Sequence, residues 1–187
     1  PRNLLAHVPD GVALEDASFA TVAAIALQGV RQTQPTLGER VAVLGLGLIG
    51  QITVQLLAAN GCRVLGFDPN PARAKLAMEM GAETAVSADL EAAAERFTRG
   101  DGLDAVVVAA STPTNGPLVQ AGEISRLRGR IIVVGLVGME VPRSLYYKKE
   151  LDLRMSMSYG PGRYDPDFEE RGFDYPIAHV RWSEQRN

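Results

Sequence analysis

The sequence is poor in the residues that disulfides, zinc lobes and nucleic-acid interfaces require. Its 187 residues include one cysteine and two histidines, so the chain can form no internal disulfide and no multi-cysteine zinc lobe. Nineteen basic and 22 acidic residues give a net charge of −3, which offers no electrostatic basis for binding nucleic acid or an anionic membrane. The longest apolar stretch, around residues 17–27, is too short and too interrupted to span a bilayer. We therefore expect a cytoplasmic protein that binds neither nucleic acid nor membrane.

What the sequence does contain is a regular alternation of apolar runs and Ala-rich amphipathic segments. Hydrophobic residues make up 46% of the chain, enough to bury a sizeable core. This alternation predicts an α/β fold with a doubly wound, six-stranded parallel sheet that helices cover on both faces. The expected strands are residues 40–44, 63–68, 84–86, 105–109, 130–134 and 151–159, and the expected helices are residues 15–32, 49–60, 72–80, 90–98 and 117–127.

The most informative motif is the glycine-rich turn that follows the first strand. Gly45-Leu46-Gly47-Leu48-Ile49-Gly50 spells G-x-G-x-x-G, and a helix is predicted to begin within it. The first glycine permits the tight turn, the second lets backbone N–H groups approach a pyrophosphate, and the third lets helix and strand pack closely. A pyrophosphate bound here lies at a helix N-terminus, where unpaired N–H groups and the helix dipole favour negative charge.

An acidic residue ends the second strand, eighteen positions after the last glycine: Asp68. Its carboxylate can accept hydrogen bonds from both ribose hydroxyls of an adenosine, and its charge would repel a 2′-phosphate. The predicted cofactor is therefore NAD(H) rather than NADP(H). Two other interpretations stay open. One is a buried strand-turn-helix without a ligand, and the other is an S-adenosylmethionine fold, which shares the glycine-rich turn and the acidic strand end.

The sequence changes character after Gly160. Residues 161–187 are rich in proline, glycine, charged and aromatic residues and show little periodicity. We expect an extended, irregular arm rather than a domain. Because aromatic side chains this dense need a surface to pack on, we expect the arm to belong to a neighbouring domain or subunit that this chain only partly contains. The start without methionine and the end without a closing element suggest an excised fragment.

Six further segments form a pattern with the glycine motif: residues 3–5, 8–10, 17–19, 38–45, 68–73 and 80–82. Together they resemble the cofactor domain of medium-chain dehydrogenase/reductases of the zinc-type alcohol dehydrogenase kind. The resemblance implies that residues 1–160 are an NAD(P)-binding Rossmann domain and that residues 161–187 are an arm of the substrate domain. The segments 158–166, 174–176 and 180–182 are similar to bacterial two-domain oxidoreductases, in which such a module precedes a glucose-fructose-oxidoreductase-like one.

The resemblance also implies roles for particular residues. It places the pyrophosphate on Leu48, Ile49 and the three glycines, and Arg73 where the family keeps a basic residue beside the adenosine ribose. Strand ends lie next to the cofactor in a doubly wound sheet. The turns after the fourth and fifth strands are therefore expected to line its adenosine and nicotinamide sides: Ala110, Ser111, Gly135, Leu136 and Val137. A solvated charge at Arg73 and ordinary turns elsewhere are the alternatives.

The family's catalytic zinc is where this chain departs from the pattern. Members that hold the metal place a cysteine, or sometimes a carboxylate, near the start of the helix before the first strand. The counterpart here is Ala20. Zinc catalysis needs three protein ligands and an open fourth position, and no such set is visible. We expect no zinc on this chain: either the site differs and other ligands lie upstream, or the enzyme works without metal, as the quinone-reductase-like relatives do.

These observations predict the NAD(H)-binding domain of a dehydrogenase or reductase that moves hydride between nicotinamide and an alcohol or carbonyl, with sugars and nucleotide sugars as one substrate class. The alternative is a non-catalytic dinucleotide-binding sensor or scaffold. No catalytic acid or base is assigned, although His179 in the arm is a candidate. Residues 146–149, Tyr-Tyr-Lys-Lys, lack the Y-x-x-x-K spacing of short-chain dehydrogenases and are expected to form a surface segment.

The last predicted strand suggests an oligomer. Leu151 to Tyr159 alternates apolar and polar residues, which is typical of a strand with one exposed or partner-covered face. Relatives in the family commonly dimerise by joining their sixth strands. An unpaired edge of this length invites association around a two-fold axis. We therefore expect a homodimer through the edge of strand 151–159.

Overall fold

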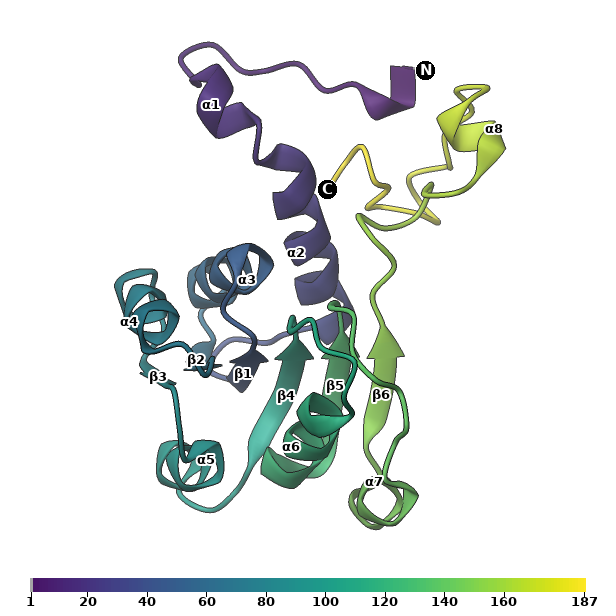
Figure 1. Ribbon diagram of the computed structural model, residues 1–187. Coiled ribbons are helices and arrows are strands. Elements are labelled where there is room, and N and C mark those ends of the chain that lie inside the picture. Colours follow the sequence, from purple (N-terminus) through teal and green to yellow (C-terminus); the bar gives the residue numbers. More distant parts are fainter. Residues whose placement is uncertain (1) are drawn as a thin grey trace.

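The centre of the computed structural model, which describes residues 2–187, is a six-stranded parallel sheet (Figure 1). The strand order is β3-β2-β1-β4-β5-β6, as the doubly wound prediction requires. The chain order reverses between β1 and β4, and a crevice forms outside the carboxyl ends of strands at such a point. The strands are β1 (Arg40–Leu44), β2 (Arg63–Phe67), β3 (Thr84–Val86), β4 (Leu103–Val108), β5 (Ser125–Val133) and β6 (Asp152–Met155).

Helices cover both faces of this sheet (Figure 1). The helices form two groups, one on each face, and the side chains of β1 alternate between them. The first group is α2 (Ala20–Thr33), α3 (Leu48–Ala59) and α4 (Pro71–Glu79), and the second is α5 (Leu90–Thr98), α6 (Gly116–Ile124) and α7 (Arg143–Lys149). Val41 and Val43 pack with α2, α3 and α4, while Ala42 and Leu44 pack with α5, α6 and α7. Burial on both faces explains why the central strands are almost continuously apolar. Within residues 2–187, no helix has the length and apolar character needed to cross a membrane.

The first expected helix, residues 15–32, is two helices. A short α1 (Leu14–Ala17) precedes α2, and a turn at Ser18 and Phe19 separates them. The Ser18 hydroxyl donates to the Glu15 carbonyl at 2.6 Å. Such a local bond offers the backbone an alternative to regular helix, which accounts for the break.

The sixth strand is shorter than predicted. The expectation of residues 151–159 is wrong in its bounds, because β6 pairs with β5 only over Asp152–Met155. The partner strand ends at Val133, and the N–H groups of Val134 and Gly135 both donate to the Val108 carbonyl. This turn carries the chain toward β4, so residues 156–159 have no strand to follow. The edge position of β6 is as predicted.

The Tyr-Tyr-Lys-Lys segment is a helix with buried contacts, and the expectation of a surface segment is wrong for two of its four residues. Tyr146 is buried in α7, and its hydroxyl donates to the Leu118 carbonyl at 2.9 Å. Burial raises the Tyr146 pKa to about 12. The Lys149 ammonium donates to three carbonyls at the end of α6 and the start of β5, on Gly122, Glu123 and Ser125. A lysine so placed satisfies carbonyls that a helix end leaves unpaired.

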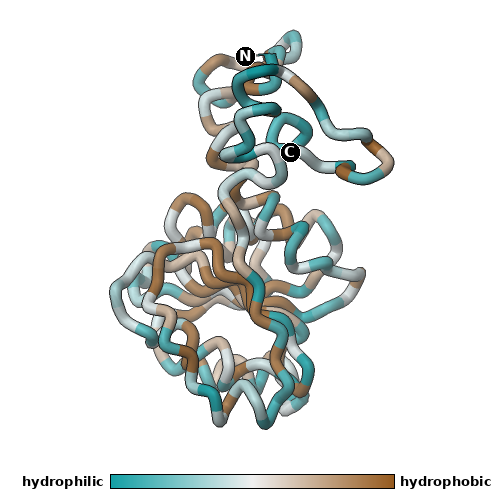
Figure 2. Tube along the Cα trace, turned by 90° about the vertical axis from the view of Figure 1, so that its right-hand side faces the viewer, coloured by the Kyte–Doolittle hydropathy of each residue, from teal (hydrophilic) through white to brown (hydrophobic). Residues whose placement is uncertain are grey.

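The two ends of the chain meet in a small lobe beside the sheet (Figures 1 and 2). The amide of Asn3, in the first helical turn η1 (Arg2–Leu4), donates to the Phe168 and Phe173 carbonyls of the arm. Phe168 lies in the short helix α8 (Pro166–Glu169) and stacks on Tyr175 with 5.4 Å between ring centroids. The arm is otherwise irregular, and Trp182 attaches it to α2 through the Arg31 guanidinium, 3.5 Å from the ring centroid. In Figure 2 the strongly hydrophobic segments gather in the sheet rather than in this lobe.

Candidate functional site

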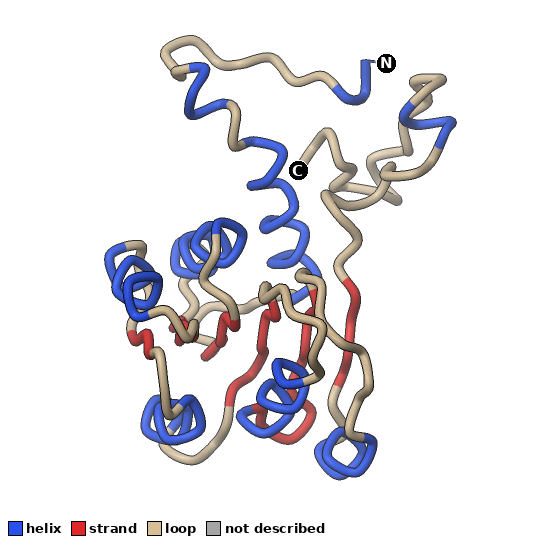
Figure 3. The backbone as a smooth tube through the Cα atoms, viewed as in Figure 1, coloured by secondary structure: helices blue, strands red, loops and turns tan. Residues whose placement is uncertain are grey.

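A cleft of about 860 Å³ opens at the carboxyl ends of β1, β2 and β4, where the strand order reverses. The turns that follow these strands meet at that end of the sheet (Figure 3). The cleft therefore occupies the place where doubly wound sheets bind their ligands. Its lining residues are Leu44, Gly45, Gly47, Phe67, Asp68, Pro69, Asn70, Arg73, Ala109, Ala110, Ser111, Thr112, Thr114, Gly116, Pro117, Val119 and Gln120.

The three glycines of the motif occupy three different environments. Gly45 has φ +91°, and a Cβ there would lie 2.5 Å from the Ala110 nitrogen. A Cβ on Gly50 would lie 1.9 Å from the Gly45 carbonyl oxygen, so only glycine lets α3 approach the turn this closely. A Cβ on Gly47 would have no heavy atom within 4 Å. The surroundings of Gly47 therefore leave room for a ligand, while those of Gly45 and Gly50 require the absence of a side chain.

The start of α3 supplies unpaired hydrogen-bond donors beside Gly47. Gly47 is the N-cap residue, and Gln51 is the residue whose N–H donates to the Gly47 carbonyl, at 2.9 Å. The N–H groups of Leu48, Ile49 and Gly50 precede this bond, and the first N–H groups of a helix have no carbonyl partner within it. Leu48 is exposed and Ile49 is half-buried. The open space at Gly47 and these donors fit the pyrophosphate of a dinucleotide.

Asp68 lies at the base of the cleft with its carboxylate held in place. Asp68 is buried, with only 5% of its surface exposed. The Leu46 N–H donates to Oδ2 at 2.8 Å, and the Asn70 N–H donates to Oδ1 at 2.9 Å. The Arg73 guanidinium lies 3.4 Å from Oδ2 and is about half exposed. A carboxylate oxygen can accept more than one hydrogen bond, so Asp68 keeps capacity for a ribose hydroxyl.

The cleft is lined by six of the twelve predicted site residues, and those after β5 are not among the lining residues. Ala110 and Ser111 line the cleft together with Gly45, Asp68 and Arg73. By contrast, Gly135 packs on the Ala110 backbone, Leu136 is 81% exposed, and Val137 is buried in a bridge to Thr112. The role of residues 135–137 on the nicotinamide side stays a prediction.

Several lining residues were not predicted from the sequence. Asn70 is one, although its signal was present: it precedes Pro71, and its side chain accepts the Ala72 N–H as the N-cap of α4. Thr112 and Thr114 follow β4, and their hydroxyl oxygens lie 3.3 Å apart beside the cleft. Their position depends on the contact between the loops after β4 and β5, which no local pattern reveals.

The residues present do not fit a catalytic zinc. Ala20 is the first residue of α2 and is exposed, and its methyl side chain has no atom that could coordinate a metal. Over the described part of the chain, no three His, Cys, Asp or Glu side chains come together as a metal site. The single cysteine, Cys62, is buried with its sulfur 3.7 Å from the Thr36 carbonyl, and burial raises the pKa of its thiol.

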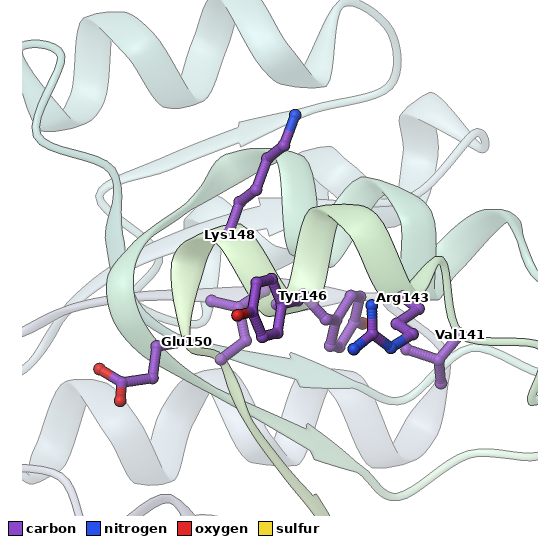
Figure 4. Close-up of a pocket in the computed structure, with 7 residues that line it drawn as sticks. Val141, Arg143, Tyr146, Lys148 and Glu150 are labelled. Atoms are coloured by element: carbon purple, nitrogen blue, oxygen red, sulfur yellow. The ribbon is translucent and has the colours of Figure 1, made fainter.

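A second cavity, of about 740 Å³, lies against α7 (Figure 4). Its lining includes Arg143, Tyr146 and Lys148, and the charged ends of Lys148 and Glu150 point away from each other. The cavity is next to the start of β6, at the opposite end of the sheet from the glycine motif (Figure 1). It shares no lining residue with the cleft, and we assign it no part in the site.

Comparisons with known proteins find dehydrogenases. The family model for zinc-binding dehydrogenases matches residues 49–171. The 2-dehydro-3-deoxy-L-galactonate 5-dehydrogenase of Pseudoalteromonas atlantica is 29% identical over 166 residues, covering 86% of this chain and 48% of the relative. A crystal structure of 2R,3R-butanediol dehydrogenase from Bacillus subtilis aligns with a TM-score of 0.73 and 26% identity, over 81% of this chain and 45% of that one.

One solved relative contains a nucleotide cofactor. A zinc-binding dehydrogenase from Sinorhizobium meliloti, solved bound to NADP, aligns with a TM-score of 0.74 and 25% identity over 84% of this chain and 48% of that one. The chain spans about half the length of the curated relatives it matches, 48% and 47% for two of them. The similarity to bacterial two-domain oxidoreductases stays a prediction.

Proposed function

The chain belongs to the zinc-binding dehydrogenase family, and we propose that it is the NAD(H)-binding part of an enzyme that transfers hydride between nicotinamide and an alcohol or carbonyl. The observation that carries the proposal is the pairing of the open Gly47 turn with the fixed Asp68 carboxylate in one cleft. A pyrophosphate site alone would accept many nucleotides. The ribose-facing carboxylate adds the selectivity of a dinucleotide cofactor site.

Bound nicotinamide would supply the hydride chemistry, and the chain's residues would bind and orient it. The glycine turn and the first N–H groups of α3 would hold the pyrophosphate. Asp68 would accept the ribose hydroxyls and repel a 2′-phosphate, which supports NAD(H) although one relative binds NADP. Ala110 and Ser111 would contact the adenosine side, and residues 135–137 the nicotinamide side.

The substrate class follows from the relatives. Two that match over most of this chain are named for a sugar-acid derivative and a diol, so we infer a small polyhydroxylated alcohol or its carbonyl as substrate. Residues 1–160 would form the NAD(H)-binding domain, and residues 161–187 would be an arm of the substrate domain that packs on the start of the chain. Without a zinc-ligand set among residues 2–187, we derive no step through zinc.

We also infer a homodimer, formed in the cytoplasm through the free edge of β6. Ser156 donates its N–H to Val133 of β5, so by the alternation along a strand the N–H groups of Leu153 and Met155 face the open side. Met155 is exposed. An edge of four residues is short, so the two-fold contact would also need neighbouring side chains.

A hydride-transfer assay of the intact protein tests the activity. Reduction of NAD⁺ is followed by absorbance with a panel of polyols, sugars and nucleotide sugars, with NADP⁺ in parallel. We expect turnover with at least one polyhydroxylated alcohol and a preference for NAD⁺. Dinucleotide binding without turnover on any substrate would instead support the non-catalytic sensor or scaffold.

A further inference from the structure

The ribose carboxylate and the glycine turn are joined by a closed ring of hydrogen bonds that passes through a side chain outside the cleft. That side chain is Gln51, in the first turn of α3. Its amide nitrogen donates to the Leu46 carbonyl at 3.1 Å and to the Arg73 carbonyl at 2.9 Å. Leu46 and Arg73 are also the two residues that reach Asp68 Oδ2, through a backbone N–H at 2.8 Å and a guanidinium at 3.4 Å.

The ring therefore runs from Leu46 to Asp68, then to Arg73, then to Gln51 and back to Leu46. Gln51 is 8% exposed, and it does not line the cleft. The two protons of its amide nitrogen are donated to carbonyls in two different segments, the glycine turn and the start of α4. A buried donor that satisfies two carbonyls is costly to remove, because both acceptors then lose a partner.

We propose that Gln51 is a positioning residue for cofactor selectivity: it holds the start of α4 against the glycine turn, and so keeps Arg73 beside Asp68 and Asp68 aligned for a ribose 2′-hydroxyl. This inference rests on the proposed function. NADH gains from the alignment, since its 2′-hydroxyl donates to Asp68. NADPH gains nothing from it, because its 2′-phosphate is repelled by Asp68 and can pair with Arg73 only if the guanidinium leaves the carboxylate.

The substitution Gln51→Met tests the proposal, since methionine has a similar volume but no N–H donor. Gln55→Met is the matched control: it lies one turn further along α3, is exposed, and loses only a 3.3 Å bond from its amide to the Gln51 carbonyl. We expect Gln51→Met to weaken NADH binding by about three- to tenfold, the cost of a lost neutral hydrogen bond. NADPH binding should change less, so the NADH-to-NADPH affinity ratio should fall, while Gln55→Met keeps the wild-type ratio.

Two measurements keep the outcomes distinct. A ratio that stays at the wild-type value in Gln51→Met overturns the inference, even if the thermal midpoint falls, because a purely structural residue would lower both affinities alike. If the wild-type protein binds neither dinucleotide, the proposed function fails instead. Hydrogen exchange then decides the inference: the Leu46 N–H, which donates to Asp68, should exchange faster in Gln51→Met than in Gln55→Met, and equal rates overturn it.

Discussion

At the scale of single residues, substitution of two glycines of one motif by alanine is expected to affect different properties, ligand binding in one case and stability in the other. Gly47 has extended backbone angles and open space around its missing side chain. Gly50 faces the Gly45 carbonyl oxygen at 1.9 Å from its ideal Cβ. The first position is open, and the second is closed by the protein itself.

Gly47→Ala should therefore change the free energy of unfolding by less than about 1 kcal/mol, the sum of a small N-cap loss and a small entropic gain. It should weaken dinucleotide binding strongly, because the methyl group occupies the pyrophosphate space. Gly50→Ala should destabilise the fold by about 1–3 kcal/mol or more, as overpacking does. Chemical unfolding and calorimetry on both variants check this, and a destabilised Gly47→Ala with intact binding would contradict it.

At the scale of elements, Asp104 in β4 joins the starts of three strands. Its carboxylate accepts the Arg40 N–H of β1 at 2.8 Å and the Arg126 guanidinium of β5 at 2.7 Å. Burial raises the pKa of Asp104, but these two donors outweigh burial and lower it below its ordinary value. A depressed pKa in the folded state stabilises the fold above the unfolded pKa, and that stabilisation is lost as the pH falls through the folded one.

Asp104→Asn should reduce the free energy of unfolding at pH 7 by about 1–3 kcal/mol. The amide replaces one acceptor oxygen by an NH₂ group, and this group would face either the Arg40 N–H or the Arg126 guanidinium, which are both donors. The variant should also lose less stability than wild type when the pH is lowered below about 4, the usual range for carboxylates. Urea unfolding at pH 7 and at pH 3 measures both effects. Parallel pH profiles for the two proteins would show that Asp104 carries no such linkage.

The contact between α7 and α6 gives a second test at this scale. Burial lowers the pKa of Lys149, with Glu123 opposing the shift, and the ammonium donates to three carbonyls. Lys149→Met should cost about 1–3 kcal/mol, because those carbonyls lose a charged donor. Lys148 is its exposed neighbour, and Lys148→Met should change the free energy of unfolding by no more than about 0.5 kcal/mol. Thermal unfolding of the pair checks this, and equal midpoints would refute the capping role of Lys149.

How far the sequence predicts these elements depends on whether their cause is local. The G-x-G-x-x-G turn and β1 were predictable, because glycine spacing and an unbroken apolar run act over a few residues. The end of β6 was not, since it depends on β5 turning away at Gly135. The same holds for α7, whose Tyr146 and Lys149 find their partners on α6. The ring through Gln51 also joins segments that only the folded chain brings together.

At the scale of the whole molecule, the free edge of β6 predicts the assembly. Met155→Pro removes an N–H that faces the open side of the edge strand, so it should weaken the dimer or convert it to a monomer. The sheet itself should stay folded, because proline is tolerated on an edge strand. Sedimentation velocity of wild type and variant at micromolar concentrations measures the change. A wild-type monomer at high micromolar concentration, or a dimer indifferent to the substitution, would contradict assembly through this edge.

The central claim for the whole molecule is that its cleft binds a dinucleotide with Asp68 on the ribose, and titration calorimetry of the intact protein with NADH and NADPH tests it most directly. We predict tighter binding of NADH by about 1–3 kcal/mol, the cost of leaving a charged group badly partnered, and a smaller difference in Asp68→Ala. Equal or tighter binding of NADPH by the wild-type protein would contradict the account.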